Sequence, residues 1–345
     1  MSEIDTYSVF IINNNNNNNK QRKNMNNFKK IGLSALAGSL AAVSVNAVEM
    51  GVSGGAAFYV GTSDENGRGY YTMGDSVTFS ASGTTDGGLD ISVSMELDGN
   101  DKPAATSVAM DDRSMSVGSA TLGTITFHQH GGTSVVGGWD DLTPNAYEES
   151  WDMTIGADTE VIGGRSGDKI LKYESPSFQG VTFLAAYQDR SDTENTGTYN
   201  DWGVKIVPEM VDGLEIGYAT GSYNDTATTE IDESTTYIKY AYGPITVGYQ
   251  ESEKDGSTTA KSDDSEAYGI TYAITDDFSI GYNKHELDVD KSASGNVQES
   301  TGISASYTMG GMTISGAMNE TDNVGGSSDA TNDKESYELG LSFAF

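Results

Sequence analysis

The chain ends on the sequence SYELGLSFAF at residues 336–345, and this stretch decides the fold. Its apolar side chains alternate with small or polar ones at Tyr337, Leu339, Leu341, Phe343 and Phe345. A period of two places the apolar side chains on one face of an extended strand. A chain that stops on an aromatic residue within such a strand is typical of a transmembrane β-barrel, because the last strand must pair with the first to leave no edge in lipid.

The N-terminal segment carries export information. A basic pair precedes a short apolar stretch at residues 31–45, and residues 45–47 have the small-x-small pattern of a signal-peptide cleavage site. The apolar stretch is too short to span a bilayer. We therefore predict a signal peptide at 25–47 and a mature chain at 48–345. Residues 1–24 hold an asparagine run ahead of a second methionine, and we interpret them as a wrongly assigned start or a disordered Asn-rich extension.

Acidic residues strongly outnumber basic ones. With 51 Asp and Glu residues against 19 Lys and Arg residues, the formal net charge is −32. This field disfavours nucleic acid as a partner and attracts cations. The chain has no cysteine, so its stability does not depend on disulfides. No segment after residue 47 is long and apolar enough for a transmembrane helix, so a membrane protein of this composition has to be a barrel.

Sixteen segments with period-2 alternation follow residue 47, and short connections alternate with long ones. This pattern, together with tyrosines near both ends of the segments, is typical of a transmembrane barrel with two aromatic girdles. A soluble β-sandwich would explain the aromatic pairs but not the asymmetry of the connections. We predict an all-β fold, a 16-stranded antiparallel transmembrane β-barrel with long external loops. The long connections are expected at residues 62–75, 98–109, 128–168, 188–200, 221–234, 251–265, 284–297 and 320–334.

Four motifs resemble the alphaproteobacterial (Rhodobacter-like) branch of the Gram-negative general porins. They are TDGGL at residues 85–89, GSATLGTIT at 118–126, KYESPSFQG at 172–180 and LGLSFAF at 339–345. The resemblance implies a homotrimer of water-filled barrels in the cell outer membrane, which lets small hydrophilic solutes and ions diffuse passively and uses no cofactor. It also implies contact with outer-membrane lipid and lipopolysaccharide. Phe345 resembles the terminal signal that the outer-membrane assembly machinery reads.

The longest connection, residues 128–168, matches by this resemblance a third loop that folds into the lumen and forms the constriction. A loop of this length is uncommon unless it is functional or disordered. A surface loop with solvated acids is the simpler alternative. The candidate constriction residues are Asp140, Asp141, Glu148, Glu149, Asp152, Asp158 and Glu160, with Trp139 and Trp151 beside them.

A small basic wall is expected to face this loop. Its candidates are Arg113, Arg165, Lys169, Lys172, Lys205 and Lys239. Strand alternation places the last three inside the barrel, whereas the parity of Arg113 with Met115 leaves its direction open. On the second and third predicted strands, the side chains expected to face the lumen carry only hydroxyl or carboxylate groups. They are Thr78, Ser80, Asp90, Ser92, Ser94 and Glu96. Because so few basic residues balance the acidic ones, we predict a pore that prefers cations.

Other functions fit the sequence less well. In a solute-specific porin of the same fold, the side chains of Trp139, Tyr147 and Trp151 would line a path along the pore and bind the solute as it passes. A secreted acidic adhesin or calcium-dependent β-solenoid would need a short fixed repeat, which the sequence lacks. A structural barrel without a pore would need only about eight strands. The acidic pairs lack the spacing of a calcium loop, and the three histidines form no metal or catalytic motif, so neither a metal site nor an enzyme is predicted.

Overall fold

The computed structural model describes residues 48–62, 69–98, 109–151, 162–189, 198–226, 229–256, 262–289, 296–328 and 333–345. The predicted signal peptide at 25–47 and the Asn-rich extension at 1–24 lie outside the described residues. Within the described ranges, no helix is long and apolar enough to cross a membrane.

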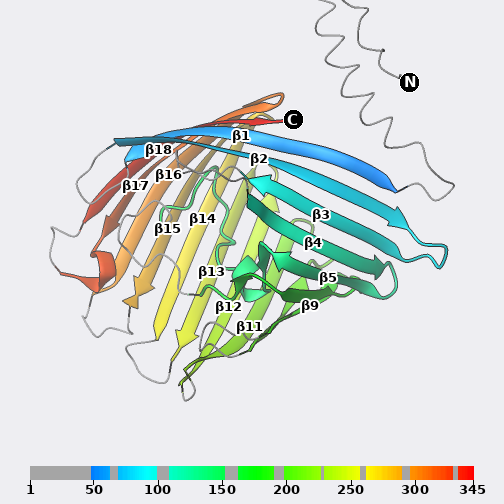
Figure 1. Ribbon diagram of the computed structural model, residues 1–345. Helices are drawn as coiled ribbons and strands as arrows, with labels where there is room; N and C mark the ends of the chain where they lie inside the picture. Colours follow the sequence, from blue (N-terminus) through cyan, green and yellow to red (C-terminus); the bar gives the residue numbers. More distant parts are fainter. Residues whose placement is uncertain are drawn as a thin grey trace, which may run out of the picture.

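Sixteen antiparallel strands close into one barrel (Figure 1), which confirms the predicted number and order. Each barrel strand pairs with its neighbours in the chain, and β1 also pairs with β18. The barrel strands are β1 (Glu49–Thr62), β2 (Gly69–Thr84), β3 (Asp90–Asp98), β4 (Ala109–Ser119), β5 (Gly123–His130), β8 (Ile170–Glu174), β9 (Val181–Gln188), β10 (Tyr199–Ile206), β11 (Leu214–Thr226), β12 (Thr229–Tyr242), β13 (Ile245–Asp255), β14 (Asp263–Thr275), β15 (Phe278–Asp288), β16 (Gln298–Met309), β17 (Met312–Asp322) and β18 (Lys334–Ala344).

The C-terminal strand closes the barrel as its alternation predicts. β18 pairs with β1 so that Leu341 stands opposite Phe58. Beyond this ladder, Gly54 and Phe345 exchange two backbone hydrogen bonds of 3.0 and 2.9 Å. A Cβ at Gly54 would lie 2.9 Å from the Phe345 ring, so the absence of a side chain at Gly54 makes room for the terminal aromatic. The last residue is therefore held by its backbone, while its side chain stays exposed.

The strands separate an apolar outer wall from a polar interior. On β18, Leu339 and Phe343 are exposed on the outer face, whereas Ser336 and Gly340 are buried on the inner face. Exposed apolar side chains on the outer face are expected where a barrel contacts lipid rather than water.

Aromatic pairs border the apolar band of the outer wall. Tyr249 and Tyr268 pair across β13 and β14 near the middle of the ladder, just before the outward side chains become polar at Glu251, with ring centroids 5.1 Å apart. Phe278 and Tyr307 pair across β15 and β16 beside the short turns, with ring centroids 6.3 Å apart. These positions agree with the two predicted girdles, because amphipathic rings favour both membrane interfaces.

The strands run further toward the loop end than the sequence predicts. β11 extends to Thr226 and β12 begins at Thr229, so most of the predicted loop 221–234 is strand. β13 likewise extends to Asp255, beyond the predicted start of the next loop at 251. The period-2 apolar signal stops where outward side chains become polar, but the backbone ladder continues past that level. Apolar alternation therefore marks the lipid-facing part of a strand rather than its full length.

Candidate pore constriction

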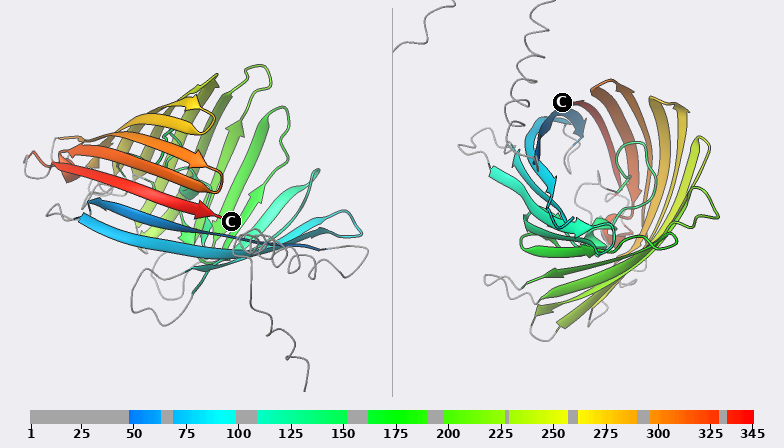
Figure 2. Two further views of the ribbon diagram at one scale, coloured as in Figure 1. Left: turned by 90° about the horizontal axis from the view of Figure 1, so that it is seen from above. Right: turned by 90° about the vertical axis from the view of Figure 1, so that its right-hand side faces the viewer.

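The segment between β5 and β8 begins and ends as a small hairpin. Strand β6 (Gly132–Thr133) pairs with β7 (Ser166–Gly167), and a short 3-10 helix, η1 (Val136–Gly138), follows β6. We call residues 131–169 the inner loop. Figure 2 shows its described part inside the ring of strands, and the contacts below are all with inward-facing residues of the wall.

The start of the inner loop packs on the wall formed by β8 to β12. Val135 and Val136 are fully buried in a cluster with Ile170 and Leu184. The Trp139 ring meets the Tyr237 ring edge-on, with centroids 5.3 Å apart. Each fully buried aliphatic side chain contributes about 1.5–3 kcal/mol. The Val136 N–H also donates to Asp201 Oδ2 at 2.7 Å, so a polar contact fixes the position of this apolar anchor.

Glycines on successive strands let the inner loop lie directly against the sheet. A Cβ at Gly248 would lie 2.4 Å from Pro144 Cδ, and one at Gly269 would lie 2.4 Å from the Pro144 carbonyl oxygen. On the next strands, a Cβ at Gly281 would meet the Ala146 nitrogen at 2.7 Å, and one at Gly302 would meet Ser150 Cβ at 2.8 Å. A side chain at any of these positions would push the loop toward the pore axis.

Polar side chains of the wall form hydrogen bonds with backbone N–H and carbonyl groups of the inner loop. The Gln250 amide accepts from the Leu142 N–H at 2.6 Å and donates to the Trp139 carbonyl at 2.6 Å. Ser304 Oγ accepts from the Ala146 N–H, and Asn283 Oδ1 accepts from the Ser150 N–H, both at 3.1 Å. Buried backbone groups need such partners, because an unpaired one costs about 1–3 kcal/mol.

The far part of the inner loop reaches the seam where β18 meets β1. The Tyr147 hydroxyl donates to one carboxylate oxygen of Glu338, and the Tyr70 hydroxyl of β2 donates to the other. Burial, followed by this hydrogen bond, raises the pKa of Tyr147 well above its usual range. Trp151 packs against His285, with ring centroids 4.5 Å apart and the ring planes tilted by 32°. The loop is thus held from β10 around to the closing seam.

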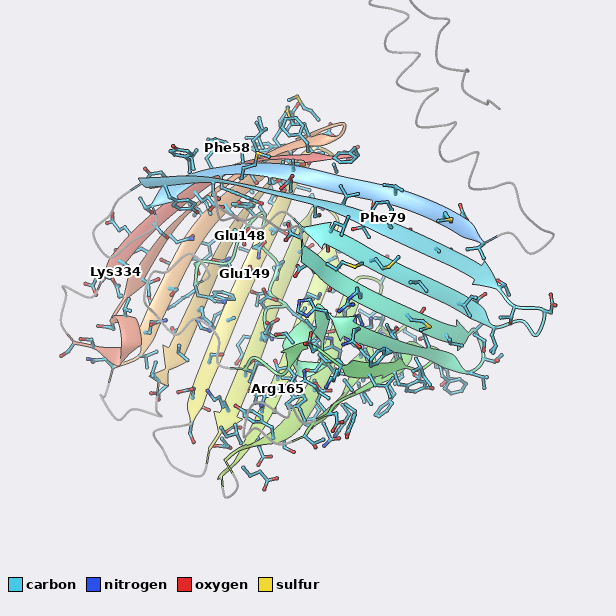
Figure 3. The ribbon with its side chains drawn as sticks, viewed as in Figure 1. Phe58, Phe79, Glu148, Glu149, Arg165 and Lys334 are labelled. Carbon is cyan, nitrogen blue, oxygen red and sulfur yellow. The ribbon has the colours of Figure 1, made fainter. Side chains whose placement is uncertain are left out.

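The structure brings four of the predicted acids into the interior. Glu148 and Glu149 directly follow Tyr147 in the chain and lie within the ring of strands (Figure 3), and Glu149 is buried and accepts a hydrogen bond from Asn145. Asp140 is partly buried and Asp141 is exposed, just after η1. The other three predicted acids lie outside the described residues, at Asp152, Asp158 and Glu160.

Three of the predicted basic residues face the interior beside carboxylates. Lys239 Nζ lies 3.2 Å from Glu215 Oε1. Lys172 interacts electrostatically with Asp201, and its Nζ lies 3.5 Å from the Ser134 carbonyl oxygen. Lys205 shares the inward parity of β10 with Asp201 and lies near Glu215. Each ammonium group is therefore at least partly balanced by a neighbouring acid.

The remaining basic residues are distributed differently from the prediction. The Arg165 guanidinium stacks 4.1 Å from the Tyr223 ring centroid and interacts with Glu233. Lys169 is exposed. Arg113 stands opposite Met95, which belongs to the exposed outer face, so the structure does not place it on the inner wall. This outward direction agrees with the parity of Arg113 with Met115, which is also exposed on the outer face.

The wall of β2 to β5 carries hydroxyls, as predicted. Thr78 stands opposite Glu96 and Ser80 opposite Ser94 on the inner face. The hydroxyls of Ser92 and Ser116 lie 2.6 Å apart across β3 and β4. The residues that sequence reasoning missed are inward acids and phenols of the strands: Tyr70, Asp201, Glu215, Glu233 and Glu338. Strand alternation could have indicated that these residues face inward, but it could not have indicated which residues they contact.

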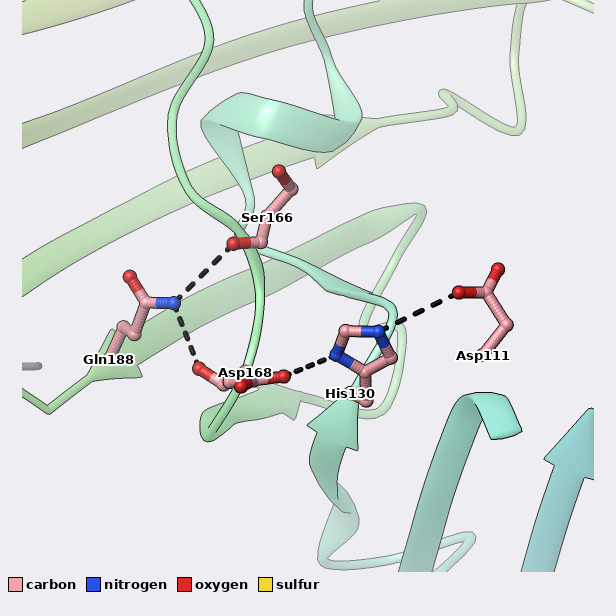
Figure 4. A network of polar contacts seen from close by, with 5 residues as sticks. All are labelled: Asp111, His130, Ser166, Asp168 and Gln188. Carbon is pink, nitrogen blue, oxygen red and sulfur yellow. Dashed lines mark hydrogen bonds and ion pairs between the residues drawn. The ribbon is translucent and has the colours of Figure 1, made fainter. Parts of the chain in front are cut away.

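A polar cluster fastens the base of the inner loop (Figure 4). His130 Nδ1 contacts Asp168, and its Nε2 lies 3.6 Å from Asp111 Oδ1. The Gln188 amide donates to the Asp168 carbonyl at 2.9 Å and to the Ser166 carbonyl at 3.5 Å. The cluster connects β4, the end of β5 and the return of the loop. Across the described ranges, no three His, Asp or Glu side chains are grouped so that they could hold a metal ion.

Comparisons with known proteins agree on the family and the fold. The family model for Gram-negative porins matches residues 32–345. The anion-selective porin from Comamonas acidovorans superposes with a TM-score of 0.65 at 14% identity, covering 86% of this chain and 100% of that one. A triple mutant of Rhodopseudomonas blastica porin superposes with a TM-score of 0.61 at 14% identity and the same coverages. OmpT of Vibrio cholerae in its trimer form gives a TM-score of 0.64 at 12% identity, covering 86% of this chain and 99% of that one. A comparison with curated protein sequences finds no match.

Proposed function

The chain belongs to the Gram-negative porin family and is an outer-membrane porin for passive diffusion, and from this premise we propose that its pore prefers cations. The observation that carries this proposal is the charge arrangement of the interior. The inward lysines lie beside carboxylates, whereas the acidic inner loop faces a wall of hydroxyls and acids. A lumen with this excess of negative charge raises the local concentration of cations.

The basic residues of the inner wall do not balance the negative charge of the acidic residues in the inner loop. Lys239 is paired with Glu215 and Lys172 lies near Asp201. The Arg165 guanidinium stacks on the Tyr223 ring and lies near Glu233. Partial pairing of this kind leaves little net positive potential to attract anions. The Comamonas porin is anion-selective, but at 14% identity it shares only the fold, and selectivity depends on side chains.

We assign the constriction to the inner loop. Its anchors on β10 to β12 and on Glu338 of β18 hold Asp140, Asp141, Glu148 and Glu149 at the interior side of the wall. Because the same segment is fixed by buried side chains and glycine contacts, it would narrow the lumen permanently rather than transiently. Asp152, Asp158 and Glu160 remain predicted members of the same acidic ring.

General diffusion is favoured over solute-specific transport. A binding track would need aromatic side chains facing the water, but Trp139 is 8% exposed and Trp151 is 3% exposed because both pack against the wall. The Tyr147 hydroxyl is engaged by Glu338. Small hydrophilic solutes are therefore expected to pass by size and charge, without a saturable site.

The surroundings of the barrel follow from the family. We infer a homotrimer in outer-membrane lipid and lipopolysaccharide, supported by the trimer form of the OmpT relative. We also infer that the outer-membrane assembly machinery reads Phe345, whose side chain is exposed at the end of the closed barrel. The assignment to the alphaproteobacterial branch rests on the four sequence motifs.

Liposome swelling with charged solutes of matched size tests the proposed preference. Liposomes that contain the protein should admit a small cationic amine faster than an anionic acid of equal size, with a neutral sugar between them. Rates that rise linearly with sugar concentration would agree with general diffusion. Faster entry of the anion would contradict the proposal, and a rate that saturates with one sugar would favour a solute-specific pore.

A further inference from the structure

The seam where β18 meets β1 carries one inward carboxylate between two small residues. Glu338 stands opposite Ala317 on β17 and opposite Gly61 on β1. Neither neighbour has a side chain large enough to cover the carboxylate, and Glu338 is only half-buried. Its carboxylate group is therefore open to the water of the lumen.

Two glycines let a phenol approach Glu338 from each side. Tyr70 of β2 stands opposite Gly61, and a Cβ at Gly61 would lie 3.0 Å from the Tyr70 ring. A Cβ at Gly340 would lie 2.9 Å from the Tyr147 hydroxyl oxygen. Each phenol donates to a different carboxylate oxygen of Glu338. A carboxylate can accept about four hydrogen bonds, so these two fix its position and leave acceptor sites for a hydrated cation.

No basic residue of the neighbouring strands balances Glu338. Strands β17, β1 and β2, which the structure describes from end to end, contain neither lysine nor arginine. Lys334 is inward on β18 itself, but it begins the strand at the loop end (Figure 3), four residues away and about 13 Å along the backbone. Charges this far apart in water are largely screened at physiological ionic strength. The charge of Glu338 therefore acts on the lumen with little compensation.

Two inward acids on the opposite side of the inner wall have cationic neighbours. Glu215 pairs with Lys239, and Asp201 lies near Lys172. At the seam, Glu148 of the inner loop adds a second acid, which acts electrostatically on the same two phenols. The negative charge of the lumen is therefore least balanced where the inner loop meets β18.

We propose that Glu338 is a specificity-determining residue of the pore, whose fixed charge attracts cations to the seam and past the inner loop. This inference rests on the proposed cation preference and names the wall residue that produces it. A unit charge about 5–8 Å from a passing ion changes the local concentration of that ion roughly two- to fourfold in water. The change has opposite signs for potassium and chloride, so the effect on their permeability ratio is larger than the effect on either ion.

Three substitutions separate this role from the contact of Glu338 with the inner loop. Glu338→Gln removes the charge but keeps the shape, and its amide can accept from one phenol and donate to the hydroxyl oxygen of the other. Glu335→Gln is the matched control, because it removes the same charge from the same strand at an outward, exposed position. Tyr147→Phe keeps the charge of Glu338 and removes the contact with the loop.

The experiment measures the reversal potential of each protein in a potassium chloride gradient, with protein isolated from cells that express the full chain. Glu338→Gln should lower the potassium-to-chloride permeability ratio at least about twofold, whereas Glu335→Gln should leave it unchanged. Tyr147→Phe should speed proteolysis of the inner loop but change the ratio less than Glu338→Gln does. Equal ratios in Glu338→Gln and Glu335→Gln would overturn the proposal. An equal fall in Tyr147→Phe would also overturn it, because a displaced loop would then explain the loss.

A cysteine variant keeps the proposal testable if Glu338→Gln does not form open channels. Because the chain has no cysteine, a thiol at Glu338→Cys can be modified selectively. An anionic thiol reagent should raise the permeability ratio of this variant, and a neutral reagent of similar size should not. Equal effects of the two reagents would overturn the role of the charge.

Failure of the proposed function would give a different result. A preference of the unmodified protein for chloride would contradict the proposed cation preference. Glu338→Gln would still move the reversal potential further toward that of chloride, because the removed charge faces the path of the ions. A reversal potential that does not move would overturn the inference, whichever ion the unmodified protein prefers.

Discussion

Replacing Gly269 by alanine tests whether the inner loop is seated directly on the barrel wall. Gly269 faces inward on β14, and a Cβ there would lie 2.4 Å from the Pro144 carbonyl oxygen and 2.9 Å from the Pro144 nitrogen. Favourable contact between heavy atoms needs about 3.5 Å, so the backbone at Pro144 has to move by roughly 1 Å toward the pore axis. Over-packing of this kind costs about 1–3 kcal/mol.

Gly269→Ala is expected to lower the single-channel conductance and to increase spontaneous closures in planar bilayers. A cost of about 1–3 kcal/mol against the seated loop raises the population of displaced conformations roughly 5- to 160-fold. Gly74→Ala is the matched control. Gly74 also faces inward, on β2 opposite Ala57, but a Cβ there would meet nothing within 4 Å.

Two outcomes would refute this reasoning. Equal conductance and closure rates in Gly269→Ala and Gly74→Ala would mean that the loop is not seated against β14. An equal decrease in both variants would mean that any added methyl group narrows the lumen, and the contact with Pro144 would then carry no special weight. A decrease confined to Gly269→Ala is the expected result.

Three further predictions follow from the contacts of the interior and the terminus. Tyr147→Phe removes the hydrogen bond to Glu338 and should cost about 1.5–3 kcal/mol, seen as faster proteolysis within residues 131–169. The control is Val204→Ala, at an outward position on β10 opposite Tyr218, and equal proteolysis of the two variants would contradict the prediction. Lys239→Gln leaves Glu215 without its ion pair and should move the reversal potential further toward cations; a move toward chloride would contradict it. Deleting Phe345 should lower assembly in cells but leave refolding in detergent nearly unchanged; normal assembly would contradict its role as a signal.

The sequence alone predicts the barrel well, because strand alternation is a local signal. The closing strand at Leu339 to Phe345 and all sixteen barrel strands follow from the period of apolar residues. The strand ends do not follow, because the ladder of β11 and β12 continues where its outward side chains are polar. A strand segment whose outward and inward side chains are both polar has the same sequence pattern as a loop, so the sequence alone does not separate the two.

The site is less predictable, because its contacts join distant parts of the chain. An acidic loop is visible in the sequence, but the carboxylate that holds it, Glu338, lies 191 residues from Tyr147. The seating of Pro144 against Gly248 and Gly269 likewise depends on a fold that no local pattern encodes.

The reversal potential of residues 48–345, the predicted mature chain without substitutions, in a potassium chloride gradient tests the central claim most directly. The excess of carboxylates in the interior and the pairing of Lys239 and Lys172 predict a potential displaced toward that of potassium. A potential displaced toward that of chloride would contradict the account, because it would require an unbalanced positive ring at the narrowest point of the pore.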